Sequence, residues 1–279
     1  MGRWQSLDWY DEARAYDVVF DAGTREEADF LEAAFARYAT GPATEAGRRG
    51  RTPAALEPAC GTGRLVLEMA ARGWAVTGYD LNHGALEYAR RRLAARRLRA
   101  TLHRDAMQRW RRRWRFDLAY NLVSSFKYLA SDEDALAHLG HVGAMLRPGG
   151  VYLLGLHLTD YADRSAHRER WRARQDGLDV TAVIETGPPD RRRRIEAMRA
   201  RLTVRPEDGG ERRRFETTWT FRTWGPRQLQ AVLDAVPVLE LVAVHDFRYR
   251  IDEPIRYGGE QLDHLLVLRR RPEQRGTGR

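Results

Sequence analysis

The sequence is poor in cysteine and in long apolar runs. Cys60 is the only cysteine in 279 residues, which excludes a disulfide within the chain and fits a reducing compartment. No apolar run reaches the roughly 20 residues of a membrane span, and the first residues lack the apolar core of a secretion signal. The sequence therefore predicts a soluble, cytoplasmic protein without a membrane partner.

Lysine is also nearly absent. Lys127 is the only lysine, so 47 of the 48 basic residues are arginine. The net charge of +9 is typical of proteins that bind nucleic acid, but so extreme a ratio of arginine to lysine also indicates a GC-rich coding sequence. A nucleic-acid partner stays open as the less favoured alternative to a small-molecule substrate.

Residues 54–73 predict a buried strand, a tight turn and an amphipathic helix. The apolar run Ala54–Leu56 ends in Glu57, the turn contains Gly61 and Gly63, and apolar residues then recur at helical spacing. Glycines let a ligand approach the backbone, and the following helix presents free N–H groups to it. An acid at the carboxyl end of the strand suits a cationic or hydroxyl-rich ligand better than a pyrophosphate.

This stretch resembles motif I of the class I S-adenosylmethionine-dependent methyltransferases, an acidic residue followed by Gly-x-Gly-x-Gly. Ala59 stands in place of the first glycine. The dinucleotide pattern G-x-G-x-x-G fits less well, because its third glycine would fall at Val66. The resemblance implies S-adenosyl-L-methionine as cofactor, bound by Glu57, Ala59, Cys60, Gly61 and Gly63.

Acidic residues follow the next two predicted strands, 75–79 and 99–103. Asp80 can accept hydrogen bonds from both hydroxyls of a ribose, although it could instead cap the helix predicted at 83–97. A lone aspartate such as Asp105 is often only a turn residue. The resemblance nevertheless implies further cofactor contacts at Asp80, Leu81, Asp105, Ala106 and Met107.

Candidates for the chemistry follow the fourth and fifth predicted core strands, 116–122 and 151–158. The resemblance implies that Asn121 contacts the cofactor, because the loop after the fourth strand borders the donor methyl group. Tyr128 in that loop is a candidate catalytic residue. His157 and Tyr161, at the end of the fifth strand, are predicted to orient the acceptor or to take its proton. For His157 the alternative is a hydrogen-bonded wall residue, and no metal site is predicted. The loop after the fourth strand also offers Ser124, Ser125 and Lys127.

Residues 1–40 predict one or two helices. Tyr16, Asp17 and Phe20 resemble the Tyr-Asp-x-x-Tyr or Phe pattern in the N-terminal lid of small-molecule methyltransferases. The resemblance implies that Tyr16, Asp17 and Phe20 lie over the cofactor or substrate, and that Tyr16 takes part in catalysis. The alternative is that both aromatic residues only pack the helix on the core.

The predicted fold class is α/β, a Rossmann-like, seven-stranded, mostly parallel sheet with helices on both faces and an antiparallel last strand. Three segments of period-two alternation within 178–224, separated by GPPD and PEDGG, predict an antiparallel β insert. The run L-R-P-G-G before the fifth strand resembles a turn of the same family. The predicted domains are a helical lid (1–40), a cofactor-binding core (54–160 and 225–270), the insert (178–224) and a flexible tail (271–279).

Together these landmarks predict methyl transfer by in-line displacement to a nitrogen or oxygen of a small-molecule acceptor. The alternatives are a nucleotide-dependent oxidoreductase, an RNA-directed methyltransferase that uses the basic surface, and a module that binds the cofactor without catalysis. The N-P-P-Y or D-P-P-Y signature of DNA-base enzymes is absent after the fourth strand, where NLVSS stands. A homodimer stays open.

Overall fold

The larger of two sheets has seven strands in the order β11-β12-β6-β5-β2-β3-β4. The computed structural model of the protein describes residues 4–45 and 50–272. The neighbours from β6 to β4 pair in parallel, and β12 runs antiparallel to both β6 and β11, which confirms the predicted fold class. The strands are β2 (Ala54–Pro58), β3 (Ala75–Asp80), β4 (Thr101–Arg104), β5 (Phe116–Asn121), β6 (Leu146–His157), β11 (Leu239–His245) and β12 (Asp263–Arg270).

Helices cover both faces of this core sheet because its central strands are apolar on both sides. Along β6, Val151 and Leu153 pack toward α2, α3 and α4, whereas Tyr152 and Leu154 pack toward α5 and α6. Ser131 caps α5, and its hydroxyl accepts a hydrogen bond from the Asp134 backbone N–H. The helices are α2 (Thr24–Tyr38), α3 (Arg64–Ala71), α4 (His83–Ala95), α5 (Asp132–Met145) and α6 (Pro226–Asp234).

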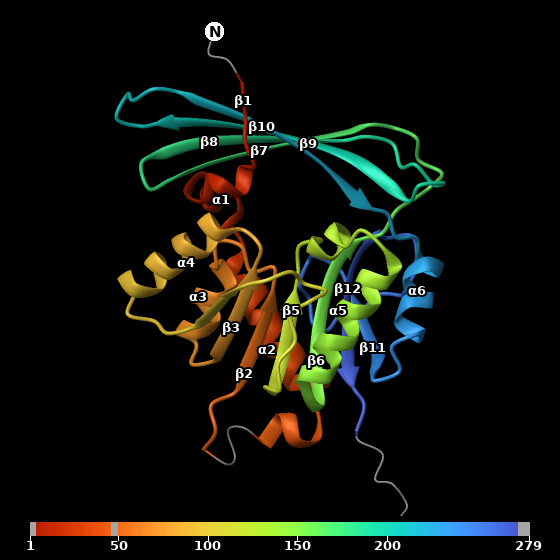
Figure 1. The fold of residues 1–279 in the computed structure, drawn as a ribbon. Helices are drawn as coiled ribbons and strands as arrows, with labels where there is room; N and C mark the ends of the chain where they lie inside the picture. Colours follow the sequence, from red (N-terminus) through yellow and green to blue (C-terminus); the bar gives the residue numbers. More distant parts are fainter. Residues whose placement is uncertain (1–3, 46–49, 273–279) are drawn as a thin grey trace, which may run out of the picture.

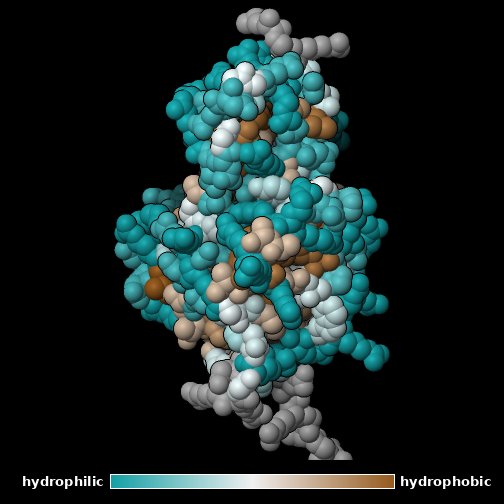
Figure 2. Space-filling view, turned by 90° about the vertical axis from the view of Figure 1, so that its left-hand side faces the viewer, coloured by the Kyte–Doolittle hydropathy of each residue, from teal (hydrophilic) through white to brown (hydrophobic). Residues whose placement is uncertain are grey.

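A second sheet lies above the first, with α1 (Ala13–Phe20) between them (Figure 1). Its strand order is β1-β10-β9-β8-β7, and α1 packs its apolar side against it. Figure 2 shows the two sheets as two lobes with a narrower waist. The strands are β1 (Gln5–Ser6), β7 (His167–Gln175), β8 (Leu178–Thr186), β9 (Ile195–Pro206) and β10 (Arg213–Arg222).

The second sheet contains two strands that the sequence did not predict. β7 was missed because Trp171 and Ala173 are the only apolar residues of this strand, too few to show an apolar alternation. β1 pairs in parallel with β10, about two hundred residues away in the chain, so the N-terminal segment is not purely helical. Only long-range pairing makes a strand of these two residues.

The L-R-P-G-G run differs from the turn that was predicted. Leu146 already pairs with Phe116, so the run begins strand β6, and the register shifts before Leu118 pairs with Val151. Gly149 has φ +79°, which only glycine adopts readily, and its carbonyl accepts a hydrogen bond from the Thr40 N–H at 2.9 Å. The run is therefore an irregular strand start that also holds the end of α2.

Ion pairs attach the second sheet to the core. Lys127, buried in the 3-10 helix η4 (Ser125–Tyr128), pairs with the buried Glu196 of β9. Asp132 at the start of α5 pairs with Arg194 at 2.6 Å and Arg222 at 2.9 Å. The only lysine, considered for the chemistry from the sequence, thus has a structural role at the lobe boundary.

No helix among the described residues is long and apolar enough to cross a membrane.

We predict opposite effects for two glycine-to-alanine substitutions. A Cβ at Gly155 of β6 would collide with the carbonyl of Leu122, from which the loop to η4 begins, whereas a Cβ at Gly140 of α5 meets nothing within 4 Å. Gly155→Ala should destabilise the protein by roughly 1–3 kcal/mol or more. Gly140→Ala should stabilise it by about 0.5–1 kcal/mol. Chemical denaturation measures both, and equal stability of the two variants would contradict this account of the close approach.

Candidate functional site

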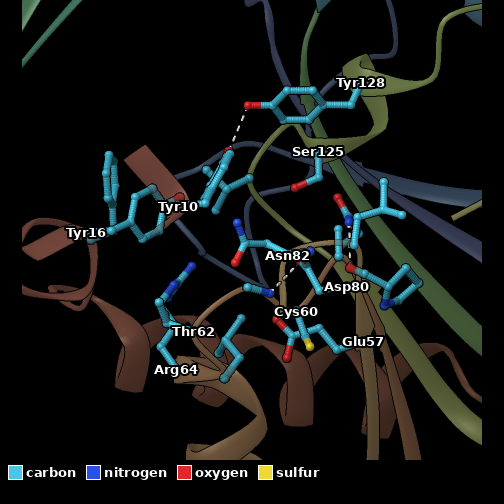
Figure 3. A pocket seen from close by; sticks show the side chains of 18 of the residues that line it. Tyr10, Tyr16, Glu57, Cys60, Thr62, Arg64, Asp80, Asn82, Ser125 and Tyr128 are labelled. Carbon is cyan, nitrogen blue, oxygen red and sulfur yellow. Dashed lines mark hydrogen bonds between the residues drawn. The ribbon is translucent and has the colours of Figure 1, made fainter. Parts of the chain in front are cut away.

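A cavity of about 1020 Å³ opens between the two lobes, at the carboxyl ends of β2, β3 and β5. Its lower wall is the glycine turn after β2 together with the loops that follow β3, β4 and β5. Its upper wall comes from the N-terminal segment, η4 and Trp171 of β7. Figure 3 shows Tyr128 and Ser125 on the opposite side of this space from Glu57 and Cys60.

Three residues of the turn between β2 and α3 have left-handed backbone angles. Ala59 has φ +51°, Gly61 +50° and Gly63 +74°. Ala59, which replaces the usual glycine, adopts the left-handed region at a cost of roughly 1–2 kcal/mol. Gly63 serves packing, because a Cβ there would lie 2.9 Å from the Cβ of Ala89 on α4. The turn thus brings α3 close to α4 and exposes the Gly61 backbone to the cavity.

The Asp80 carboxylate joins this turn to the end of β3. It accepts hydrogen bonds from the backbone N–H groups of Gly61 and Asn82, both at 2.8 Å. Burial raises the pKa of Asp80, and these backbone hydrogen bonds oppose that rise. The helix-cap alternative for Asp80 is wrong, because the Asn82 side chain caps α4 by accepting from the Ala85 N–H. Asp80 therefore faces the cavity with acceptor lone pairs left for a ligand.

Glu57 is a buried carboxylate at the end of β2. Its Oε2 atom is shielded from solvent and makes no hydrogen bond of normal geometry within the described residues, although the Tyr120 hydroxyl lies close enough to lower the carboxyl pKa. Burial is the larger effect, and it raises the pKa of Glu57 well above its usual range. Such a group favours a ligand that supplies a positive charge or a donor hydrogen.

Arg64, the first residue of α3, places a guanidinium beside Glu57 in the same cavity. Its Nη2 pairs with Glu27 of α2 at 2.7 Å, and its Nη1 donates to the Thr24 hydroxyl at 3.1 Å. The positive charge of Arg64 acts against the burial effect on the Glu57 pKa. The cavity therefore presents charges of both signs next to the glycine turn, which suits a zwitterionic ligand.

Aromatic side chains form the upper wall. The hydroxyls of Tyr10 and Tyr128 lie 2.8 Å apart and connect the N-terminal segment to η4 (Figure 3). The Tyr10 ring lies 5.0 Å from that of Tyr16, and the Phe20 ring meets Trp171 edge-on at 5.1 Å. Burial raises the pKa of Tyr10, Tyr16 and Tyr128 above the ordinary value. These hydroxyls stay protonated near neutral pH, so they are available as hydrogen-bond donors and are poor bases.

Two aspartates hold the N-terminal segment on the core. Asp17 of α1 is buried, accepts a hydrogen bond from the Thr62 hydroxyl at 2.8 Å, and pairs with Arg92 of α4 at 2.7 Å. Asp11, in the 3-10 helix η1 (Trp9–Asp11), accepts a hydrogen bond from the Asn82 side-chain amide at 2.8 Å. Within the Tyr-Asp-x-x-Phe pattern, the aromatic residues face the cavity and the aspartate anchors the segment.

Most of the residues selected from the sequence line this cavity. Gly63 and Ala106 are not among its lining residues, and neither is His157. His157 lies half-exposed at the end of β6, where its Nδ1 is 2.7 Å from the Asp263 carboxylate, so the structure gives it no contact with the cavity. The selected residues that do line it are Tyr16, Phe20, Glu57, Ala59, Cys60, Gly61, Asp80, Leu81, Asp105, Met107, Asn121, Ser125 and Tyr128.

Several residues that line the cavity were not predicted from the sequence. Arg64 had a usable signal, because it directly follows the last glycine of the turn at the positive end of a helix. Asn82 had one as well, since it is a helix cap two positions after Asp80. Tyr10 and Trp171 had none, because distant pairing in the second sheet brings them to the site. Phe247 and Tyr249, from the loop after β11, also line the cavity.

The chain matches known proteins through its central region. A family model described as a methyltransferase domain matches residues 55–150. A curated relative, dTDP-3-amino-3,4,6-trideoxy-alpha-D-glucopyranose N,N-dimethyltransferase of Streptomyces venezuelae, is 33% identical over 109 residues, or 38% of this chain and 44% of the relative. The chain spans about two fifths of the length of the curated relatives that it matches.

Solved structures share nearly the whole fold at low identity. An S-adenosylmethionine-dependent methyltransferase from Clostridium acetobutylicum is 18% identical, with a TM-score of 0.71 over 95% of this chain and 100% of that one. DesVI from Streptomyces venezuelae is 21% identical, with a TM-score of 0.69 over 96% of this chain and 100% of that one. At this identity the matches show a shared fold.

The resemblance drawn from the glycine turn is thereby confirmed: residues 55–150 match a methyltransferase domain, and the chain shares the fold of a solved S-adenosylmethionine-dependent methyltransferase.

Proposed function

We propose that the protein transfers the methyl group of S-adenosylmethionine to a small-molecule acceptor, with an amino nitrogen favoured over an oxygen. The observation that carries the proposal is a single cavity that joins the acid-flanked glycine turn to an aromatic wall. Its volume of about 1020 Å³ is at the upper end of the roughly 300–1,000 Å³ of a pocket for one ligand. It therefore leaves room for an acceptor beside the cofactor.

The residues present fit this cofactor. The partnerless Oε2 of Glu57 would accept from the α-amino group of the methionine part, and Arg64 would face its carboxylate. Asp80 would accept from the ribose hydroxyls, with Asp105 and Met107 beside the adenine. Each proposed contact matches a charge or a donor on the ligand with a group of the opposite kind on the chain.

The chain's own contribution is then positioning. The sulfonium supplies an activated methyl group when the cofactor is bound, and alignment of the acceptor lone pair can contribute roughly 7–11 kcal/mol. The rings of Tyr10 and Tyr16 form part of the wall, and aromatic faces attract a cation such as a sulfonium. Phe20 and Trp171 restrict the space left for the acceptor.

Two observations favour nitrogen. The hydroxyls of Tyr10 and Tyr128 are neutral near physiological pH, and a neutral amine needs less help from a base than an alcohol does. The S. venezuelae relative is named for dimethylation of an amino sugar carried by a nucleotide. We therefore infer an amino sugar or a similar small amine as the acceptor class.

Calorimetry and acceptor assays test this proposal. The protein should bind S-adenosylmethionine and S-adenosylhomocysteine, and mass spectrometry should detect one or two added methyl groups on nucleotide-linked amino sugars but not on their hydroxyl analogues. Cofactor binding without transfer to any amine would contradict the proposed acceptor. Failure to bind either cofactor would end the proposal altogether.

We predict that Glu57→Gln changes cofactor affinity and apo stability in opposite directions. Loss of a charge-assisted contact should weaken binding of S-adenosylmethionine roughly 10- to 100-fold by calorimetry. Because burial raises the Glu57 pKa, the stability that this group contributes is lost as the pH rises through its folded-state pKa. The variant without ligand should therefore melt higher than the wild type at alkaline pH but not at acidic pH.

The matched control for this prediction is Glu26→Gln, an exposed position on α2 that does not line the cavity. Wild-type affinity should rise with pH as Glu57 ionises, and this dependence should disappear only in Glu57→Gln. Unchanged affinity of Glu57→Gln for S-adenosylmethionine would show that the Glu57 carboxylate does not contact the ligand.

We predict that Tyr128→Phe lowers kcat by no more than about tenfold, because an orienting hydrogen bond contributes roughly 0.5–1.5 kcal/mol. Removal of a general base would lower kcat by about 10²–10⁴-fold. Tyr10→Phe removes the other half of the hydroxyl pair and should have a similar effect. Tyr257→Phe, whose hydroxyl donates to the Pro226 carbonyl away from the cavity, is the control. A loss of a thousandfold or a changed pH profile in Tyr128→Phe would instead assign it the proton transfer.

A further inference from the structure

The positive charge of the chain is concentrated in one segment. Residues 90–115 contain 12 arginines and a single acidic residue, Asp105. The rest of the chain contains 36 basic and 38 acidic residues, so it is slightly acidic overall. GC-rich coding explains why arginine replaces lysine, but it does not explain why 12 arginines share this stretch with a single acidic residue.

The fold gathers this segment on one edge of the core lobe. It forms the second half of α4, the connection to β4, the edge strand β4 itself and the loop that leads to β5. Figure 2 views the molecule from this side. Ten of its arginines are exposed, and we call them the arginine edge: Arg91, Arg96, Arg97, Arg99, Arg104, Arg109, Arg111, Arg112, Arg113 and Arg115.

The charge of the arginine edge is not neutralised within the described residues, where none of the ten arginines forms an ion pair with an acidic side chain. The two remaining arginines of the segment differ, because Arg90 pairs with Glu87 and Arg92 with Asp17. On the second sheet, too, exposed arginines such as Arg168 and Arg199 pair with Glu185. Ten unpaired guanidinium groups side by side repel one another, and a bound polyanion would remove that repulsion.

We propose that the arginine edge binds the phosphate backbone of a single-stranded nucleic acid. A guanidinium donates two parallel hydrogen bonds to a phosphate. Trp114 lies within the edge with 45% of its surface exposed, and its ring is 5.5 Å from that of His103. Single-strand binders combine such a charged track with aromatic rings on which bases stack.

A protein partner fits this surface less well. Trp114 is the only large apolar side chain of the segment that is exposed, whereas protein interfaces have an apolar centre that is depleted of charge. Interfaces with nucleic acid are polar and strongly positive. Trp110, the other tryptophan of the segment, is fully buried and stacks on Tyr79 at 4.5 Å, so it supports the loop rather than a ligand.

The arginine edge also adjoins the cavity, since Arg104 lines both, and Gln108 lines the cavity nearby. A strand held along the edge would pass the cavity mouth. Binding there does not depend on the proposed methyl transfer to an amine, because the charge and its placement stand without any assumption about the acceptor.

Fluorescence anisotropy with a labelled single-stranded RNA of about 16 nucleotides tests the proposal. The triple variant Arg111→Gln, Arg112→Gln, Arg113→Gln removes three exposed charges outside the cavity. The control triple variant Arg168→Gln, Arg170→Gln, Arg174→Gln removes three exposed charges from β7. For the wild type, affinity should fall with added salt at a log–log slope of roughly 0.7 per phosphate contacted. The first variant should lose at least tenfold in affinity and about two units of slope, and the control less than twofold.

Other results would overturn the proposal. These are absence of binding at low salt, equal losses in both triple variants, or equally effective competition by polyglutamate or by vesicles of anionic lipid, which would indicate an acidic protein or a membrane surface instead. The affinity of each protein for S-adenosylmethionine is measured by calorimetry in parallel. Unchanged cofactor affinity in the first variant shows an intact fold, and it separates a failure of this proposal from a failure of the methyltransferase proposal.

Discussion

The cost of burying one carboxylate governs the candidate site. Glu57 lies at the end of β2, an inner strand of the sheet, between two apolar layers that exclude water. A buried charge without a full set of partners is costly. The surrounding packing holds it there because β2 also pairs with β3 and β5. A ligand with a positive group would pair with the Glu57 carboxylate, which has no such partner in the free protein. The unpaired carboxylate therefore lowers the stability of the free protein and favours binding of such a ligand.

The roof of the cavity belongs to both lobes at once. The N-terminal segment pairs with β10 through β1 and packs α1 on the second sheet. It also reaches the core through Asp17 and Asp11, which contact residues next to the glycine turn and next to Asp80. The second sheet is fixed in turn by Lys127 and Asp132 near the end of β5. The same few loops thus carry the lower wall of the cavity and position its upper wall.

Sequence reasoning recovered the parts of the structure that local pattern controls. Apolar runs predicted the core strands, and the acids that follow them in order, Glu57, Asp80 and Asp105, all line the cavity. Local pattern failed where distant segments meet. The contact between Tyr10 and Tyr128 joins positions more than one hundred residues apart, and β7 shows no apolar alternation. His157 has the right residue type at a strand end, yet its side chain turns toward Asp263 on the surface.

The seclusion of Lys127 determines which reagents and enzymes can act on this chain. Its ammonium, the only one that any side chain provides, lies against Glu196 with about 4% of its surface accessible. Acylation and ubiquitin-type conjugation of lysine therefore have no accessible side chain in the folded protein, and amine-directed cross-linkers or dyes meet the same barrier at Lys127. Trypsin, by contrast, finds arginine along almost the whole sequence, so proteolysis rather than amine labelling is the suitable probe of its conformation.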